Sequence, residues 1–153
     1  MIKQSYVRDK RSPTPLNEVV SRVMSSNKGV DTKPELILRH ALREAGFPGY
    51  RLYWNKVPGH PDICYPGKRI AIFVNGCFWH RCPKCNLPLP KTNNEFWNEK
   101  FQRNIDRDKK KIKALESENW TVVTVWECEI ENDIQNVVGA LVDLLNFRTD
   151  PNH

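Results

Sequence analysis

Three cysteines and one histidine lie within nine residues of this chain, at Cys77, His80, Cys82 and Cys85. Zinc prefers four ligands in a tetrahedron, and the Cys-x-x-Cys spacing lets two thiolates bind one ion from a tight turn. Cys128, at the end of a predicted strand, can supply a further thiolate. His80 competes with Cys82 for a ligand position, and four cysteine ligands would leave His80 for chemistry. Buried reduced cysteines are the alternative, but three in one loop favour zinc.

Two acidic residues stand where they could hold a metal ion. Asp62 opens a predicted strand directly after a turn, and a carboxylate at such a strand end can hold Mg²⁺ against a phosphate. Its plainer interpretation is a turn residue. Glu35 closes a predicted capping box that begins at Thr32, and from that helix start it could equally point toward a metal site. The sequence leaves both alternatives open.

A third acidic residue, Asp108, falls inside the apolar stripe of a long predicted helix. The stripe recurs at intervals of four and three residues: Phe101, Ile105, Asp108, Ile112 and Leu115. A buried carboxylate costs roughly several kcal/mol unless it is paired or bound to something. We therefore expect either a salt bridge with an arginine or an inward-facing acid that orients a catalytic histidine.

Basic residues on the same helix predict contacts with an anionic partner. Seven Lys or Arg lie between positions 100 and 113, and the chain carries a net charge of +6 with a pI near 9.1. Such a charge favours nucleic acid as partner, although a solvated helix face is the plainer explanation. The residues expected to contact the DNA backbone are Arg103, Arg107, Lys109 and Lys110.

Three aromatic residues, Phe78, Trp79 and Trp97, lie in or beside predicted loops. They could form a small satellite of the core. Adjacent Phe and Trp in a basic loop held by a metal also fit a wedge that inserts between base pairs and unstacks them.

These residues need a scaffold, and the hydrophobic pattern predicts one in the order α-β-β-β-α-β-α. We expect a helix at 32–45, strands at 50–54, 62–65 and 69–74, a helix at 94–117, a strand at 121–126 and a helix at 134–147. The third strand is almost wholly apolar, which is typical of a central strand covered on both faces.

The length of 153 residues suits one domain. We expect a basic arm at 1–25, a single domain at 26–148 and a disordered tail at 149–153. No apolar run approaches the roughly 18 residues that cross a bilayer, and the polar first residues predict no signal peptide. Five cysteines in a cytosolic context make disulfides improbable, and Cys64, in mid-strand, is most simply a core residue.

Several strings of the chain, taken together, resemble the very short patch repair (Vsr) DNA mismatch endonucleases. The similarity runs in order from about Val20 to Asn132, and the most specific string is Gly-Cys-Phe-Trp-His at 76–80. The strings that carry it are 21–25, 31–36, 57–62, 72–80, 95–97, 104–108 and 125–128.

The resemblance implies a restriction-endonuclease-like (PD-(D/E)xK-type) α/β core, with a central mixed β-sheet flanked by helices and a structural zinc site. It implies Mg²⁺-dependent nicking of duplex DNA beside a T:G mismatch left by deamination of 5-methylcytosine. A cytoplasmic, nucleoid-associated monomer in a prokaryote is the expected setting. Partners could include mismatch-repair proteins, and no membrane is involved.

Site roles follow from the same resemblance. Asp62 would be the principal Mg²⁺ ligand, helped by the main-chain carbonyl of Val74. His80 would handle the attacking water with Asp108 as its partner, and Glu35 would be an outer acidic member of the site. The intercalating residues would be Phe78, Trp79 and Trp97, and the zinc ligands Cys77, Cys82, Cys85 and Cys128.

Two positions depart from the best-known family pattern. Asn75 stands where that pattern carries a histidine; Asn can hydrogen-bond a metal-bound water but cannot take a proton near neutral pH. Cys82 replaces a histidine zinc ligand, with one residue inserted before Cys85, which makes a four-cysteine site. Two other functions stay open: a catalytically weak, zinc-stabilised module that binds distorted duplex DNA, favoured by Asn75, and a restriction-type nuclease that cuts unmodified foreign DNA.

Overall fold

The computed structural model describes residues 30–148, so the predicted arm at 1–25 and the tail at 149–153 lie outside the described residues. The described chain follows the predicted order of helices and strands. Its elements are α2 (Lys33–Glu44), β1 (Arg51–Leu52), β2 (Ile63–Tyr65), a 3₁₀ turn (Pro66–Lys68), β3 (Ile70–Asn75), α3 (Asn94–Ser117), β4 (Thr121–Trp126) and α4 (Glu127–Phe147).

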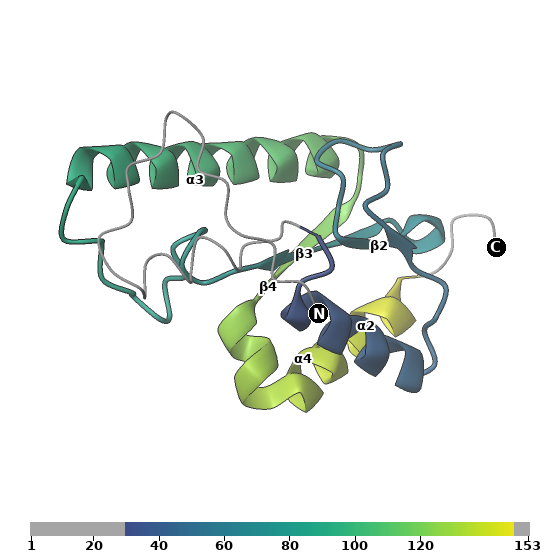
Figure 1. The fold of residues 1–153 in the computed structure, drawn as a ribbon. Coiled ribbons are helices and arrows are strands. Elements are labelled where there is room, and N and C mark those ends of the chain that lie inside the picture. The colour runs from purple at the N-terminus through teal and green to yellow at the C-terminus, as the bar shows by residue number, and fades with distance from the viewer. Residues whose placement is uncertain (1–29, 149–153) are drawn as a thin grey trace, which may run out of the picture.

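The strands form one mixed sheet in the order β1-β2-β3-β4. The first two pairs are antiparallel, while β3 and β4 are parallel. A parallel pair needs a long crossover connection, and α3 supplies it. Figure 1 shows α3 on one side of the sheet, with α2 and α4 on the other. The expected mixed α/β architecture, a sheet flanked by helices, is confirmed.

Alternation along β3 divides the core into two layers. Ile70 and Ile72 pack with α2 and α4 in the larger apolar cluster. Ala71 and Phe73 face the other way and pack with Leu115 of α3 in a second cluster. Successive side chains of a strand point to opposite faces, so a strand covered on both sides must be apolar throughout. The expectation for this central strand is therefore confirmed, and Cys64 is fully buried in the second cluster, as expected of a core residue.

Two elements differ from the predicted boundaries. Strand β1 ends at Leu52 because Tyr53 has a φ of 48°, which lies in the left-handed region and cannot continue an extended strand. Helix α4 begins at Glu127 and not at 134, with a break at Asp133. The Asp133 carboxylate accepts the N–H of Asn136 at 3.1 Å, which is the bond of a helix N-cap. The predicted helix is thus the second part of α4.

None of the described helices is long and apolar enough to cross a membrane.

Candidate active site

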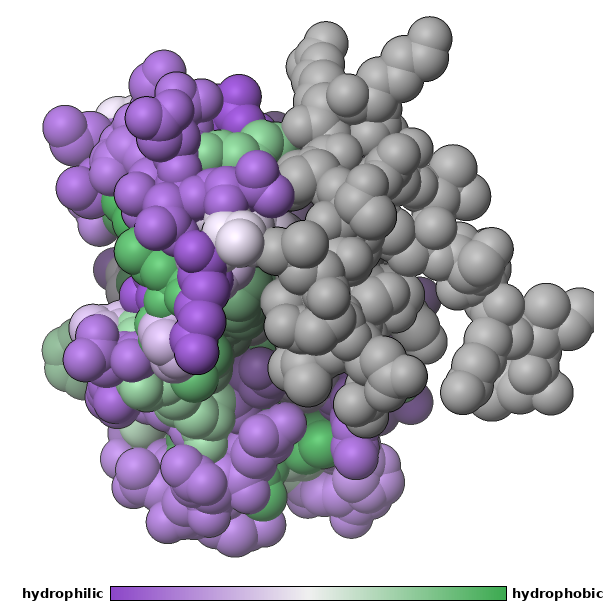
Figure 2. Space-filling model, turned by 60° about the vertical axis from the view of Figure 1, so that its left-hand side comes forward, coloured by the Kyte–Doolittle hydropathy of each residue, from purple (hydrophilic) through white to green (hydrophobic). Residues whose placement is uncertain are grey.

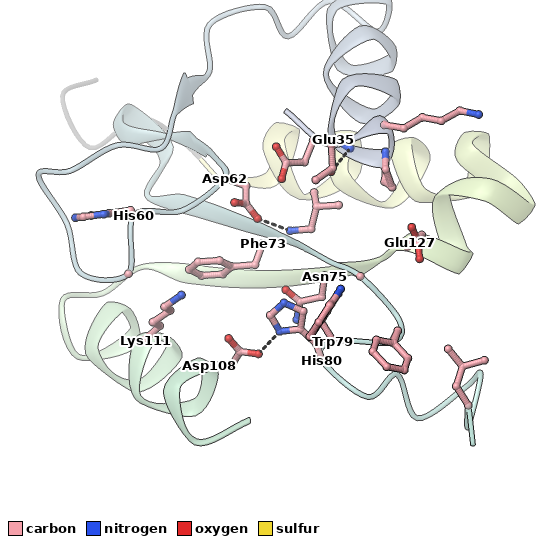
Figure 3. Close-up of a pocket in the computed structure, with 18 residues that line it drawn as sticks. Glu35, His60, Asp62, Phe73, Asn75, Trp79, His80, Asp108, Lys111 and Glu127 are labelled. Carbon is pink, nitrogen blue, oxygen red and sulfur yellow. Dashed lines mark hydrogen bonds and ion pairs between the residues drawn. The ribbon is translucent and has the colours of Figure 1, made fainter. Parts of the chain in front are cut away.

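A cleft of about 700 Å³ opens beside the end of β3, between the start of α2 and the middle of α3. Figure 3 shows side chains from both helices, from β3 and from the loops before β2 and after β3 pointing into it. The five candidates for catalysis all line this cleft, although they are far apart in sequence: Glu35, Asp62, Asn75, His80 and Asp108.

Asp62 lies at the floor of the cleft, where β2 begins. Its Oδ2 accepts the main-chain N–H of Val74 at 2.8 Å, which orients the carboxylate against β3. Burial raises the pKa of Asp62 to about 6, the bond from Val74 acts in the opposite direction, and nearby Glu35 raises the pKa further. A carboxylate whose charge is disfavoured by its surroundings gains from a cation placed beside it.

The structure shows where the Glu35 side chain lies, which the sequence left open between capping the helix and pointing toward a metal site. The Thr32 hydroxyl oxygen accepts the Glu35 N–H at 3.4 Å, so the backbone half of the predicted capping box is present. The Glu35 carboxylate is only 2% exposed, and it accepts hydrogen bonds from Arg39 Nη2 at 3.2 Å and from the Tyr53 hydroxyl. Burial raises the pKa of Tyr53 to about 12, so the phenol stays protonated and donates. The Glu35 carboxylate is thereby held at the cleft wall.

His80 and Asp108 form a close pair across the cleft. Nδ1 of His80 lies 2.6 Å from Oδ2 of Asp108, and both side chains are half-buried. Because an ionised carboxylate can only accept, Nδ1 carries the proton of this bond. The other ring nitrogen, Nε2, then remains as a proton acceptor. Of the two interpretations of Asp108, the structure shows the one in which the acid orients a histidine.

The four cysteines expected to bind zinc gather beside the cleft. The sulfur atoms of Cys77, Cys82, Cys85 and Cys128 all lie within 4.8 Å of one another. Four sulfurs at about 2.3 Å from a tetrahedral ion are about 3.8 Å apart, and the Cys82–Cys128 separation is 3.8 Å. Burial raises the pKa of the Cys128 thiol to about 11, whereas hydrogen bonds from the backbone N–H groups of Cys85 and Lys84 outweigh burial and lower the pKa of Cys82. The cluster could hold a metal ion such as zinc.

This cluster joins the loop after β3 to the first turn of α4, because Cys128 is the second residue of that helix. The main-chain N–H of Cys128 also donates to Cys77 Sγ at 3.4 Å. His80 comes from the same loop but turns to Asp108. A metal ion on the four sulfurs would therefore hold the loop that presents His80 to the cleft.

The three aromatic residues expected to intercalate belong to one cluster but differ in how far they are buried. Phe78 and Trp79 are half-buried and line the cleft. Trp97 lies in the first turn of α3, beside the loop as expected, but it is only 2% exposed. Its ring stacks on Phe101, one helical turn further on, at 5.6 Å between ring centroids. Phe78 packs edge-on against both of these rings. Trp97 is thus the buried residue against which Phe78 and Trp79 pack.

The four basic residues expected at the DNA backbone, Arg103, Arg107, Lys109 and Lys110, are exposed on α3. The side of the molecule that carries the start of this helix is largely hydrophilic, with separate apolar areas (Figure 2). Lys111 behaves differently, because it is half-buried and lines the cleft. It was not among the expected site residues. Its spacing of three from Asp108, which places both on one helix face, was the available signal.

Comparison with known proteins identifies the family of this chain. Residues 16–87 match the family described as DNA mismatch endonuclease Vsr. A protein named DNA mismatch endonuclease Vsr from Escherichia coli is 37% identical over 115 residues, which cover 75% of this chain and 73% of the relative.

The chain belongs to the Vsr family.

Other relatives of this Vsr-family chain are named as nicking enzymes. Type II nicking enzyme V.NaeI from Lentzea aerocolonigenes is 39% identical, over 88% of this chain and 81% of the relative. Type II nicking enzyme V.XorIIP from Xanthomonas oryzae pv. oryzae is 37% identical, over 94% of this chain and 98% of the relative. The similarity therefore covers most of this chain and most of each relative.

Both departures from the Vsr pattern lie at the site. Asn75 is the last residue of β3, is buried, and lines the same cleft as Asp62 and His80. Cys82 lies in the cluster of four cysteines that could hold a metal ion. Tyr53, which holds Glu35, was not predicted by the sequence analysis, because a tyrosine after a short strand carries no sign that it reaches a helix 18 residues earlier in the chain.

Proposed function

We propose that this Vsr-family protein is a Mg²⁺-dependent endonuclease that nicks one strand of duplex DNA beside a T:G mismatch arising from deamination of 5-methylcytosine. The observation that carries the proposal is the convergence of Asp62 with the His80–Asp108 pair in one cleft. The relatives named as a mismatch endonuclease and as nicking enzymes support it. We also propose that residues 26–148 form one restriction-endonuclease-like domain that acts as a monomer in the cytoplasm.

Asp62 and the carbonyl of Val74 would hold Mg²⁺. The N–H of Val74 points at Asp62, and in an extended strand the N–H and C=O of one residue point to the same side. The carbonyl oxygen is therefore directed toward the Asp62 carboxylate, and both are the hard oxygen donors that Mg²⁺ prefers. Glu35, whose charge is felt at Asp62, would bind the outer water shell. When bound, the ion polarises the phosphate and stabilises developing charge.

His80 would act on the attacking water. Asp108 holds Nδ1–H, which leaves Nε2 to take a proton and stabilises the imidazolium that results. Asn75 can orient water through its amide but cannot accept a proton at neutral pH. Of Asn75 and His80, only His80 can therefore accept the proton of the attacking water.

The aromatic wedge would provide selectivity for the mismatch. Phe78 and Trp79, at the cleft, would insert into the base stack, with Trp97 as the buried support beneath them. A mispaired base is cheaper to unstack than a paired one, so insertion favours the mismatch. The phosphate backbone would be bound by the exposed basic residues of α3: Arg103, Arg107, Lys109 and Lys110.

The ion on Cys77, Cys82, Cys85 and Cys128 would be a structural zinc. Four thiolates complete its coordination, so no position is left for a reacting water. Its contribution would be to hold the loop that bears Phe78, Trp79 and His80 against α4.

One assay separates the candidate functions. Purified protein is incubated with matched and T:G duplexes, with and without Mg²⁺, and strand breaks are resolved on a denaturing gel. The proposal expects nicks only with Mg²⁺ and mainly on the T:G duplex. Mismatch-selective binding without nicks would identify the weak DNA-binding module that Asn75 favours, and efficient cutting of matched, unmodified duplex would identify a restriction-type nuclease.

A further inference from the structure

Lys111 is the lysine of α3 that turns toward the cleft. Three other lysines of this helix are exposed, at positions 109, 110 and 113. Lys111, in contrast, is half-buried and lines the cleft together with Asp62 and His80. Figure 3 shows its amine reaching from α3 toward Phe73, into the space that Asp62 and His80 also face. The amine lies 5.9 Å from the centre of the Phe73 ring.

The loop before β2 makes room for this side chain. A Cβ atom placed on Gly59 would lie 2.9 Å from Cγ of Lys111, closer than real contacts allow. Gly59 also has a φ of 79°, a conformation that glycine adopts without strain. The stem of Lys111 therefore packs against this glycine, which directs its ammonium group toward Phe73 and the cleft.

The ammonium group carries a charge that the protein itself does not neutralise by close contact. Among residues 30–148, no carboxylate oxygen lies within 4.0 Å of it. Asp108, one turn earlier on the same face, is taken by His80 at 2.6 Å. The charge of Lys111 still reaches Asp62, whose pKa it lowers. A directed cation beside the proposed metal ligand fits a phosphate oxygen as its partner.

Resting on the proposed nuclease function, we propose that Lys111 is a further catalytic residue, whose ammonium group binds a non-bridging oxygen of the scissile phosphate. Negative charge on these oxygens grows as the water attacks, so a fixed donor there stabilises the transition state more than the ground state. Lys33, the other lysine that lines the cleft, is exposed at the start of α2 and is not held in this way.

The test compares single-turnover nicking of a T:G duplex by the wild-type protein and by Lys111→Met, at saturating enzyme and with Mg²⁺. We expect the rate to fall by about 10²- to 10³-fold, while the dissociation constant for the duplex changes by less than about threefold. Lys113→Met is the matched control: it removes an exposed lysine from the same helix, and its nicking rate should equal that of the wild type. Melting temperatures are measured for every variant.

A second variant separates charge from packing. In Lys111→Ala, added ethylammonium should restore part of the nicking rate, which a loss of packing alone would not allow. If Lys111→Met does not fold, Lys111→Gln and this rescue carry the test. Nicking by folded Lys111→Met within threefold of the wild-type rate, or a slow Lys111→Ala that alkylammonium does not rescue, would overturn the inference. If the wild-type protein itself nicks neither duplex, it is the proposed function that fails.

Discussion

Replacing Asp62 by Asn should abolish nicking and at the same time stabilise the protein. The carboxylate is needed for Mg²⁺ but is unfavourably placed without it, since burial raises its pKa from the ordinary 3.8 to about 6. At 1.36 kcal/mol for each pKa unit, this difference corresponds to about 3 kcal/mol of unfolding free energy. The amide of Asn keeps an oxygen that can accept the Val74 N–H, so the substitution removes the charge and keeps the bond.

The sign of the pH dependence follows from linkage. Asp62 is an acid whose folded pKa lies above its unfolded value, so its charge costs stability fully above about pH 6, and the cost disappears as the pH falls below 3.8. Asp62→Asn avoids this cost at every pH. Its advantage over the wild type should therefore be about 3 kcal/mol at pH 8, and about 1 kcal/mol smaller at pH 5.5. For a chain of this length, 3 kcal/mol corresponds to roughly 6–12 °C in melting temperature.

Urea unfolding at both pH values measures this difference. The buffer contains neither Mg²⁺ nor a chelator, so that a metal ion on the cysteines stays bound. Added Mg²⁺ should stabilise the wild type by mass action and leave Asp62→Asn unchanged, which reports metal binding without relying on catalysis. Asp106→Asn is the control, because it removes the same charge from an exposed position on α3.

Two results would refute the reasoning. If Asp62→Asn were no more stable than Asp106→Asn at pH 8, the charge of the Asp62 carboxylate would not lower the stability of the folded protein. If it nicked T:G duplex within about tenfold of the wild-type rate, a barrier change of only about 1.4 kcal/mol, Asp62 would be a turn residue and not a metal ligand.

Three further predictions concern the partners of this site. Elemental analysis should find one zinc for each chain, and Cys128→Ser should lose it and unfold at lower temperature, because structural zinc contributes directly to folding; a zinc-free protein with the fold intact would contradict this. Asp108→Asn should slow single-turnover nicking by about 10²- to 10⁴-fold with little change in melting temperature. The Asn amide can donate to Nδ1 of His80, which favours the tautomer with the proton on Nε2 and removes the proton acceptor. A nicking rate within threefold of wild type would show that Asp108 does not orient His80 for catalysis. Trp97→Ala should lower the unfolding free energy by about 3–5 kcal/mol, as large core truncations do. Trp79→Ala should mainly weaken binding to mismatched duplex, by about 1–3 kcal/mol. If both variants lose the same stability, and Trp79→Ala keeps the wild-type ratio of T:G to matched affinity, the wedge is ruled out.

The order of the elements could be predicted because local pattern decides it. The apolar run of β3 and the stripe of α3 are each read within one segment. Boundaries that depended on a single backbone angle could not be read in this way. Tyr53, in the left-handed region, shortens β1, and the break at Asp133 hides the first turns of α4 from a search for one continuous helix.

The members of the site could also be proposed from sequence, but not their arrangement. Cysteine spacing predicted the four sulfurs that the fold brings together, since three of them lie in one loop. The direction of Glu35 was open, because a capping residue and a cleft residue occupy the same helical position. Tyr53 and Arg39 decide it, and they reach Glu35 only in the folded chain.

By itself, then, the sequence determined the succession of helices and strands, the family and the set of residues able to do chemistry, because periodicity and spacing are local properties. Only the tertiary structure decided that Lys111 faces the cleft while Lys110 faces solvent, and that Trp97 is buried beneath Phe78. These outcomes depend on which surfaces meet when α3 packs across the sheet. Contacts between segments far apart in the chain set them, and a local pattern does not record those contacts.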